Sequence, residues 1–290
     1  MLNGTKVLET EPHNVLCTGS SGFIGKYVVE ALQKLGYTVI PFDLVEGCDI
    51  RDANKLNEVV EKTRPQWIIH LAAQVFLSPS LKNPQEDATI NIIGTINVLE
   101  AARKFGCGVI LSSSGAIYGN NYQYPEPISP YGVSKLTAEH YCKIYRNLYG
   151  VKTVVFRFSS IYGQGRKKTS INLILDKAMK GEPIQVSGDG QQSRDFTYVG
   201  DVAEAAVMAV KGKFPSDTYD IGTGTATSIN ELIGLIRRLL KRKVTVSYVE
   251  TSLGDPKRNE LNVGKAAFYG FKAKVSLIEG LKQLIRETEK

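Results

Sequence analysis

Short apolar runs alternate with amphipathic helical patterns from Asn14 to about residue 160, and this alternation leaves few possible folds. The successive apolar runs read N-V-L-C-T, T-V-I-P-F, W-I-I-H-L-A-A, G-V-I-L-S-S and T-V-V-F-R-F. The helical patterns between them cover about residues 24–35, 53–62, 87–105 and 131–149. Strands that alternate with helices are joined by right-handed crossovers and therefore lie parallel. The sequence thus predicts an α/β fold with a doubly wound parallel sheet.

The alternation of strand and helix patterns ends after Tyr162, where turn-rich segments and separate helical patterns follow. A helix is expected over about 170–180. We interpret this half as a smaller C-terminal α/β lobe that covers the carboxyl ends of the strands, where open α/β sheets bind ligands. The predicted division is 14–160 for the sheet domain and 161–290 mainly for a substrate-binding lobe. The two are interleaved, because about 195–225 is expected to return to the sheet.

The charge of the chain favours a small anionic ligand over a nucleic acid. The formal net charge is +7 at pH 7, from 36 Lys and Arg against 29 Asp and Glu. The basic residues are scattered and form no stripe interleaved with aromatic side chains, which is the pattern that nucleic-acid binding requires.

The four cysteines Cys17, Cys48, Cys107 and Cys142 are far apart and form no C-x-x-C pair, and no histidine stands at ligand spacing. We therefore expect neither a metal site nor a disulfide framework, which is typical of a reducing compartment. Residues 1–13 lack the apolar stretch of a signal peptide, and no uninterrupted apolar run of about 18 residues follows. The sequence predicts a cytoplasmic protein without a membrane segment.

A glycine-rich turn, T-G-S-S-G-F-I-G, joins the first strand to the first helix and contains Gly19, Gly22 and Gly25. Glycine allows a tight turn and a close approach of backbone N–H groups to a pyrophosphate at the helix N-terminus. Asp43 ends the second strand, 18 residues after Gly25, where a carboxylate can accept both ribose hydroxyls. With no Arg or Lys beside Asp43, a 2′-phosphate would be repelled, so this Rossmann-type pattern predicts NAD rather than NADP.

A further cofactor contact is indicated by C-D-I-R-D at 48–52. Asp49 and Ile50 follow a short strand and could flank the adenine by a hydrogen bond and by packing. The same residues are equally compatible with helix capping by Asp49 or Asp52.

S-P-Y-G-V-S-K at 129–135 places Tyr131 and Lys135 four residues apart at the start of a helix, hence on one face. A lysine ammonium in this position lowers the pKa of the tyrosine from about 10 toward neutrality. A phenol tuned in this way is a general acid or base for a hydroxyl group. The serine run at 112–114 ends the preceding predicted strand and supplies candidate hydrogen-bond donors.

Taken together, these motifs resemble an extended short-chain dehydrogenase/reductase over almost the whole chain. Within that group the chain is similar to the NAD-dependent nucleotide-sugar epimerase/dehydratase family, and most similar to its UDP-glucose (UDP-galactose) 4-epimerases. The motifs that carry the resemblance are T-G-S-S-G-F-I-G, H-L-A-A-Q, N-I-I-G-T, S-S-S-G-A-I-Y-G, S-P-Y-G-V-S-K, G-D-G-Q-Q-S-R-D-F-T-Y-V-G-D-V and G-D-P-K-R.

The resemblance implies a set of residues that line NAD. They are Gly19, Gly22, Phe23, Ile24, Gly25, Asp43, Asp49, Ile50, Leu71, Ala72, Ala73, Asn91, Ser112, Tyr131, Lys135 and Phe158.

The resemblance also implies the catalytic roles. Tyr131 takes the proton of the sugar 4-hydroxyl, Lys135 tunes Tyr131 and holds the nicotinamide ribose, and Ser114 hydrogen-bonds the same sugar oxygen. Arg194 matches the arginine that binds the nucleotide diphosphate, a role suited to its fork of donors. Family members are often dimers, which predicts a homodimer.

Substrate contacts are less well matched. Ser160 stands where the family often has an asparagine, and Ser252 where it often has an arginine. Both of those family residues hold the diphosphate. Arg258 or the basic run at 166–168 could replace them.

Gly115 and Ala116 follow Ser114, where the resemblance implies Asp or Glu in dehydratases. Neither residue can move a proton, so the sequence favours 4-epimerisation by transient oxidation at C4, rotation of the 4-keto sugar and hydride return. The alternatives are a 4-ketoreductase or dehydratase of the same family, and a non-catalytic nucleotide-binding module.

Overall fold

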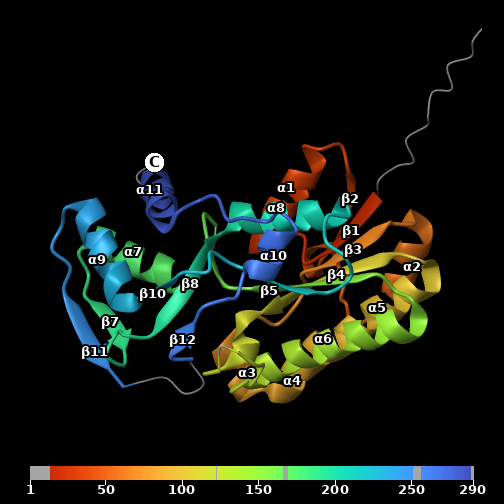
Figure 1. Ribbon diagram of the computed structural model, residues 1–290, viewed down its shortest axis with the longest axis horizontal. Coiled ribbons are helices and arrows are strands. Elements are labelled where there is room, and N and C mark those ends of the chain that lie inside the picture. Colours follow the sequence, from red (N-terminus) through yellow and green to blue (C-terminus); the bar gives the residue numbers. More distant parts are fainter. Residues whose placement is uncertain (1–13, 122, 166–168, 251–255, 289–290) are drawn as a thin grey trace, which may run out of the picture.

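The computed structural model describes residues 14–121, 123–165, 169–250 and 256–288 (Figure 1). The chain forms a larger lobe around one parallel sheet and a smaller lobe against one end of that sheet. Within the described ranges, none of the helices combines the length and apolarity that crossing a bilayer requires.

The larger lobe contains a six-stranded sheet in the order β2-β1-β3-β4-β5-β9, in which every neighbouring pair is parallel. Its strands are β1 (Asn14–Thr18), β2 (Thr38–Phe42), β3 (Trp67–His70), β4 (Gly108–Ser114), β5 (Thr153–Phe158) and β9 (Thr218–Ile221). The predicted doubly wound Rossmann-type sheet is confirmed. The strand order reverses direction between β1 and β3, and this switch point is where such sheets bind ligands.

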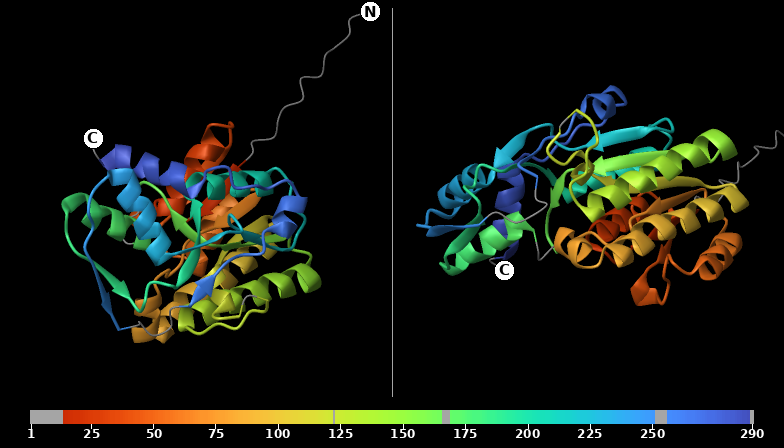
Figure 2. Two further views of the ribbon diagram at one scale, coloured as in Figure 1. Left: turned by 60° about the vertical axis from the view of Figure 1, so that its left-hand side comes forward. Right: turned by 90° about the horizontal axis from the view of Figure 1, so that it is seen from below.

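Helices cover both faces of the sheet. On one face lie α1 (Phe23–Gln33) and α8 (Val199–Val210), and on the other lie α2 (Ala53–Thr63), α5 (Gly94–Phe105) and α6 (Pro130–Tyr149) (Figure 1). The helices α5 and α6 run side by side (Figure 2). Each face is closed by its own apolar cluster, which contains Val28 and Leu32 of α1 on one side and Leu56 and Leu99 on the other. Each such buried side chain contributes about 1.5–3 kcal/mol to stability.

The predicted long helix before β4 is interrupted by a wider turn. Helix α4 (Pro84–Ala88) leads into a π-helical turn at Thr89–Ile93, which continues as α5. The amide of Gly94 reaches back five residues to the carbonyl of Thr89 in this turn. Such turns occur mostly as single insertions and often at functional sites, and this one contains Asn91.

The smaller lobe combines short strands with three helices. Its strands are β6 (Ser160–Tyr162), β7 (Ile184–Ser187), β8 (Ser193–Tyr198), β10 (Ala226–Ser228), β11 (Val246–Val249) and β12 (Arg258–Asn259). Its helices are α7 (Ser170–Lys180), α9 (Ile229–Leu240) and α11 (Leu277–Thr288). Strand β8 pairs with β6, β10 and β12, and β7 pairs with β11. A third apolar cluster joins the three helices.

The chain passes between the lobes repeatedly. Helix α8 and strand β9 follow β8 of the smaller lobe, yet α8 packs on α1 and β9 is the edge strand of the large sheet. The remaining short elements are α3 (Leu77–Lys82), α10 (Gly264–Phe268) and the 3-10 turns Leu44–Glu46 and Gly115–Tyr118.

Candidate active site

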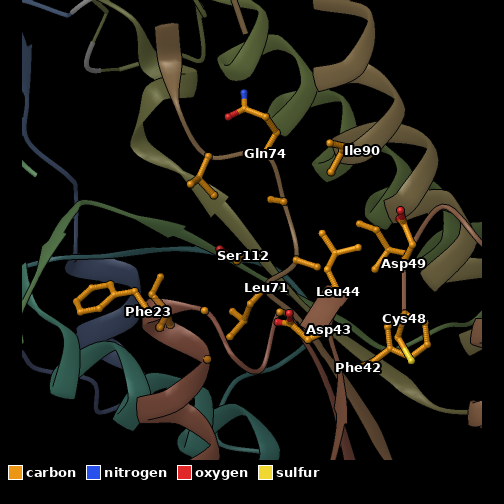
Figure 3. Close-up of a pocket in the computed structure, with 18 of the residues that line it drawn as sticks. Phe23, Phe42, Asp43, Leu44, Cys48, Asp49, Leu71, Gln74, Ile90 and Ser112 are labelled. Atoms are coloured by element: carbon orange, nitrogen blue, oxygen red, sulfur yellow. The ribbon is translucent and has the colours of Figure 1, made fainter. Parts of the chain in front are cut away.

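A cavity of about 800 Å³ opens at the carboxyl ends of the strands around the switch point (Figure 3). It brings together most of the residues expected to line NAD. The cavity is lined by Gly19, Gly22, Phe23, Ile24, Gly25, Asp43, Asp49, Ile50, Leu71, Ala72, Ala73 and Ser112, together with Phe42, Leu44, Cys48, Arg51, Gln74, Val75, Phe76, Pro79, Ile90 and Gly165.

The glycine turn has the close packing that its sequence indicates. Gly19 has a positive φ of 70°, and a Cβ there would lie 2.7 Å from the backbone nitrogen of Ala72. At Gly25 a Cβ would lie 2.1 Å from the carbonyl oxygen of Gly19. Since these neighbours are backbone atoms, a side chain at either position would displace the turn. The turn therefore presents its amides at the start of α1 in the form that suits a pyrophosphate.

Asp43 joins the glycine turn to the second strand. Its Oδ2 accepts a hydrogen bond from the amide of Ser21 at 3.0 Å, and its Oδ1 accepts one from the amide of Val45 at 3.2 Å. The carboxylate lies at the cavity (Figure 3), where its remaining lone pairs can accept ribose hydroxyls.

The structure gives Asp49 and Asp52 different partners. Asp52 caps α2 by accepting from the amide of Lys55 at 3.0 Å. Asp49 instead binds the guanidinium of Arg51, with 2.6 Å between Nη2 and Oδ2, and this hydrogen bond lowers the pKa of Asp49. Arg51 also contacts Glu86 at 2.9 Å. Because two carboxylates already neutralise Arg51, this cation in the cavity wall is poorly suited to a 2′-phosphate, which agrees with NAD.

His70 belongs to a buried chain of hydrogen bonds in which each group donates to the next. The amide of Ala72 donates to Thr18 Oγ1 at 3.2 Å, and Thr95 Oγ1 donates to the carbonyl of Asn91 at 2.7 Å. The hydroxyl of Thr18 is then left to donate to His70 Nδ1 at 2.8 Å, and His70 Nε2 must donate to Thr95 at 3.1 Å. A neutral His70 therefore carries its proton on Nε2.

This burial predicts an acid-sensitive fold. Burial, followed by the charge of Lys135, lowers the pKa of His70 to about 3 in the folded protein, against about 6.5 when unfolded. Below about pH 6.5 the unfolded chain binds a proton that the native state excludes, so stability falls as the pH drops toward 3. Between pH 7 and pH 5 this group should remove about 2 kcal/mol from the free energy of unfolding. Urea titrations at both pH values, compared with His70→Gln, measure the contribution; an equal pH dependence in the variant would contradict it.

A second cavity, of about 280 Å³, adjoins the first and shares Ile24, Val75 and Ser112 with it. It contains Ser114, Tyr131, Phe158 and Ser160 of the predicted set. The remaining lining residues are Ser113, Ser159, Ile161, Tyr162, Thr169, Ser170, Ile171 and Phe196. The ends of β4, β5 and β6 and the start of α6 thus meet around one space.

The three serines of the run have different surroundings. Ser113 Oγ donates to Glu139 Oε1 at 2.5 Å and is buried. Ser114 Oγ accepts from the amide of Ala116 at 3.1 Å and so begins the 3-10 turn that follows it. This leaves the Ser114 hydroxyl hydrogen to donate into the cavity. Ser112 lines both cavities.

Lys135 is 4% exposed on α6, one turn after Tyr131. Burial lowers its pKa to about 8, against the opposing charges of Asp87 and Glu139. Among the described residues no hydrogen-bond acceptor is recorded for its ammonium. A buried ammonium with spare donors fits the hydroxyls of a ribose, so the residues present suit a bound dinucleotide.

Asn91, which was predicted to contact NAD, binds the loop after β3. Asn91 is absent from the lining of both cavities, and its amide is committed to the protein. Its Oδ1 accepts from the amide of Gln74 at 2.9 Å, and its Nδ2 donates to the carbonyl of Gln74 at 3.0 Å. Asn91 therefore holds the loop after β3, which lines the first cavity, called the cofactor cavity below.

The predicted diphosphate ligands lie on neighbouring strands of the smaller lobe, outside the lining of both cavities. Arg194 on β8 donates to the carbonyl of Ser193 at 2.7 Å, and Arg258 on β12 pairs with Glu260. Ser193 is the register partner of Arg258. The other candidates, 166–168 and Ser252, lie outside the described residues.

The sequence interpretation missed the segment after β3. Gln74, Val75, Phe76 and Pro79 all line the cofactor cavity. The motif H-L-A-A-Q at 70–74 contained the only available signal, because Gln74 ends it.

Known proteins are similar to this chain over most of its length. A model of the "NAD dependent epimerase/dehydratase family" matches residues 15–222. A putative UDP-glucose 4-epimerase of Methanocaldococcus jannaschii is 37% identical over 93% of this chain and 97% of its own length. A UDP-glucose 4-epimerase of Mycolicibacterium smegmatis is 31% identical over 93% of this chain and 96% of its own length.

Among solved structures, the UDP-glucose 4-epimerase of Thermotoga maritima with UDP-glucose is 33% identical, with a TM-score of 0.90 over 96% of this chain and 100% of that one. The UDP-glucose 4-epimerase of Thermus thermophilus with NAD is 29% identical, with a TM-score of 0.88 over 95% of this chain and 99% of that one.

Proposed function

The chain belongs to the NAD-dependent epimerase/dehydratase family, and on this premise we propose that it is a nucleotide-sugar 4-epimerase of the UDP-glucose/UDP-galactose type. The observation that carries the proposal is the meeting of Ser114 and Tyr131 in a cavity that adjoins the dinucleotide cavity. Relatives named UDP-glucose 4-epimerase, and neighbours solved with NAD or a UDP-sugar, support the reaction and the ligands.

The chain's own residues account for the proton transfer. Tyr131 accepts the proton of the sugar 4-hydroxyl, and the Lys135 ammonium stabilises the phenolate that this requires. Ser114 donates to the same sugar oxygen and holds it toward Tyr131. Bound NAD would supply the acceptor and donor for the hydride at C4 of the sugar. Tyr131 then gives the proton back to the 4-oxygen.

The second cavity lacks the acid that an elimination requires. Among the described residues that line it there is no Asp, Glu, His or Cys. At Gly115 a Cβ would lie 2.9 Å from the side-chain amide atoms of Asn259, so a carboxylate there would require the Asn259 side chain to move. This supports epimerisation over dehydration.

The function is tested by incubating the purified protein, without added cofactor, with UDP-glucose, UDP-galactose and their N-acetyl and uronic-acid relatives. Interconversion at C4, followed by NMR of the sugars, is expected without net NAD reduction. In a parallel incubation with NAD(P)H and a 4-keto nucleotide sugar, stoichiometric oxidation of NAD(P)H would indicate the 4-ketoreductase. A lasting 4-keto-6-deoxy product in the first incubation would indicate the dehydratase. Binding without turnover would indicate a nucleotide-binding module.

We also propose that Arg194 grips the substrate diphosphate, although it lies outside the lining of both cavities. Arg194→Ala should raise the KM for the nucleotide sugar by roughly 10- to 100-fold, because a charge-assisted hydrogen bond contributes about 1.5–3 kcal/mol. The turnover number should change little. Steady-state kinetics beside Arg238→Ala, an exposed arginine of α9, measure the effect; equal KM values in both variants would remove Arg194 from the substrate site.

Three finer features complete the proposal. The protein acts in the cytoplasm, its residues 14–160 bind NAD while 161–290 mainly bind the sugar nucleotide, and it forms a homodimer. Val133, Ile144 and Leu148 of α6 are 49%, 47% and 67% exposed, which supports a helix-to-helix contact between two copies.

A further inference from the structure

We propose that Asp87, which lies outside both cavities, is the counter-ion that keeps the Lys135 ammonium charged beside Tyr131. Asp87 is a positioning residue in this role, because it acts through Lys135 and contacts neither cofactor nor sugar. The inference rests on the proposed function of the Tyr131–Lys135 pair and adds a third, buried member to it.

A buried polar network connects Asp87 to the helix that carries Lys135. Asp87 is 1% exposed on α4, and its Oδ1 accepts from Gln74 Nε2 at 2.8 Å and from Asn91 Nδ2 at 3.1 Å. The same Asn91 Nδ2 lies 3.1 Å from the hydroxyl of Ser134, the residue before Lys135. The carboxylate is thus fixed between the wall of the cofactor cavity and α6.

The second oxygen of this carboxylate is unusual. Asp87 Oδ2 is buried, and no hydrogen-bond partner for it lies among the described residues. A buried carboxylate is costly unless a positive charge compensates it. Helix α4 packs against α6, and among the described residues no oxygen accepts a hydrogen bond from the Lys135 ammonium. The negative charge of Asp87 raises the pKa of Lys135. Each buried charge therefore compensates the other across α4 and α6.

The other groups around Lys135 leave two carboxylates as its charged neighbours. His70, from β3, is neutral because its pKa is lowered to about 3. The Cys142 thiol on α6 is neutral because burial raises its pKa to about 12. Asp87 and Glu139 both raise the pKa of Lys135 against the larger effect of burial.

Asp87 is the more effective of the two carboxylates, because Glu139 already has a cation of its own. Arg157 on β5 binds Glu139 through Nε and Nη2, with 2.7 Å between Nη2 and Oε2, and Ser113 occupies Oε1. That ion pair offsets most of the charge Glu139 presents to Lys135. Asp87 has two neutral donors and no arginine partner, so its full charge acts on Lys135.

Asp87→Asn tests the proposal with little structural disturbance. An asparagine at this position keeps an oxygen for Gln74 and Asn91 and has nearly the same shape. Its NH2 group replaces the oxygen that has no partner, so the charge is lost with little change in volume. In the NAD-bound protein labelled with ¹³C at the lysine ε-carbons, the Lys135 resonance is assigned from its loss in Lys135→Arg. Its titration should move to lower pH by about one unit in Asp87→Asn. The alkaline limb of the kcat profile should move in the same direction.

Three variants control this measurement. Asp176→Asn makes the same change at an exposed aspartate of α7 that pairs with Lys180, and it should leave the Lys135 titration unaltered. Glu139→Gln should produce a smaller shift than Asp87→Asn. Asp87→Glu retains the charge and should keep the wild-type titration, which maintains the test if Asp87→Asn fails to fold.

An unchanged Lys135 titration in Asp87→Asn, an equal shift in Asp176→Asn, or a lowered value in Asp87→Glu would overturn the counter-ion role. The ¹³C titration observes Lys135 directly and does not depend on turnover. Its outcome is therefore independent of whether the proposed function is correct. A protein that converts no UDP-sugar would sink the proposed function while the Asp87–Lys135 coupling still stands.

Discussion

Tyr131→Phe is expected to lower kcat by roughly two to four orders of magnitude, the usual contribution of a positioned general acid or base. The variant keeps the aromatic ring between β4 and α6 and removes only the phenolic oxygen. Without it, there is no carboxylate, imidazole or thiol among the described residues that line the second cavity to accept the 4-hydroxyl proton. The other tyrosine of this lining, Tyr162 on β6, is protonated at neutral pH, because burial raises the pKa of its hydroxyl.

The measurement must separate turnover from cofactor binding. Initial rates follow sugar interconversion by NMR, and NAD released by denaturation gives the occupancy of each preparation. We expect full occupancy in Tyr131→Phe, because the cofactor cavity is formed by other elements. Tyr141→Phe, an exposed tyrosine on the same helix, is the matched control and should retain wild-type turnover. A Tyr131→Phe protein with wild-type turnover would remove this residue from the mechanism.

Gly25→Ala is expected to cause the largest loss of cofactor binding. The added Cβ would lie 2.1 Å from the carbonyl oxygen of Gly19 and 2.6 Å from that of Ser20. Neither atom belongs to a flexible side chain, so the turn must move away from α1. Displacements of this kind cost about 1–3 kcal/mol. If the cofactor-bound form alone bears that cost, NAD affinity falls by up to about 100-fold.

Calorimetric titration of NAD into the stripped protein measures this effect. Gly234→Ala is the matched control, because Gly234 lies inside α9 with no atom within 4 Å of its added Cβ. There the change should stabilise the fold by about 0.5–1 kcal/mol and leave NAD binding intact. Wild-type affinity in Gly25→Ala would show that the turn does not hold the pyrophosphate.

The sheet and the cofactor cavity were predictable because their signals are local. Strand runs and helical periodicity predicted β1 to β5 and most of the helices between them to within a few residues, but not the separate elements α8 and β9. The glycine turn predicted the position of the cofactor site between β1 and α1. Gly19 and Asp43 follow strands whose carboxyl ends meet at one edge of a parallel sheet. Once those strands are recognised, the residues that follow them are expected to lie close together.

The interior of the site was not predictable in the same way. Asn91 and Asp87 lie in a stretch with ordinary helical periodicity, and nothing in the sequence indicates the π-helical turn that follows α4. Their hydrogen bonds to Gln74 and Ser134 join segments that are distant along the chain. Partner choice of this kind depends on packing between helices, which single-sequence patterns do not encode. The resemblance matched Asn91 to a cofactor contact, which stays a prediction, but it did not indicate the hydrogen bonds of Asn91 to Gln74, Asp87 and Ser134.

The repeated passage of the chain between the two lobes affects how the protein can be divided. Removal of everything after Tyr162 would take away α8, which covers α1, and β9, which closes one edge of the large sheet. The nucleotide half would then expose an apolar face and an unpaired strand edge, the usual starting points of aggregation. For the same reason no single proteolytic cut releases an intact half. Recombining this protein with a relative thus calls for exchanging several separate segments together, rather than one continuous block.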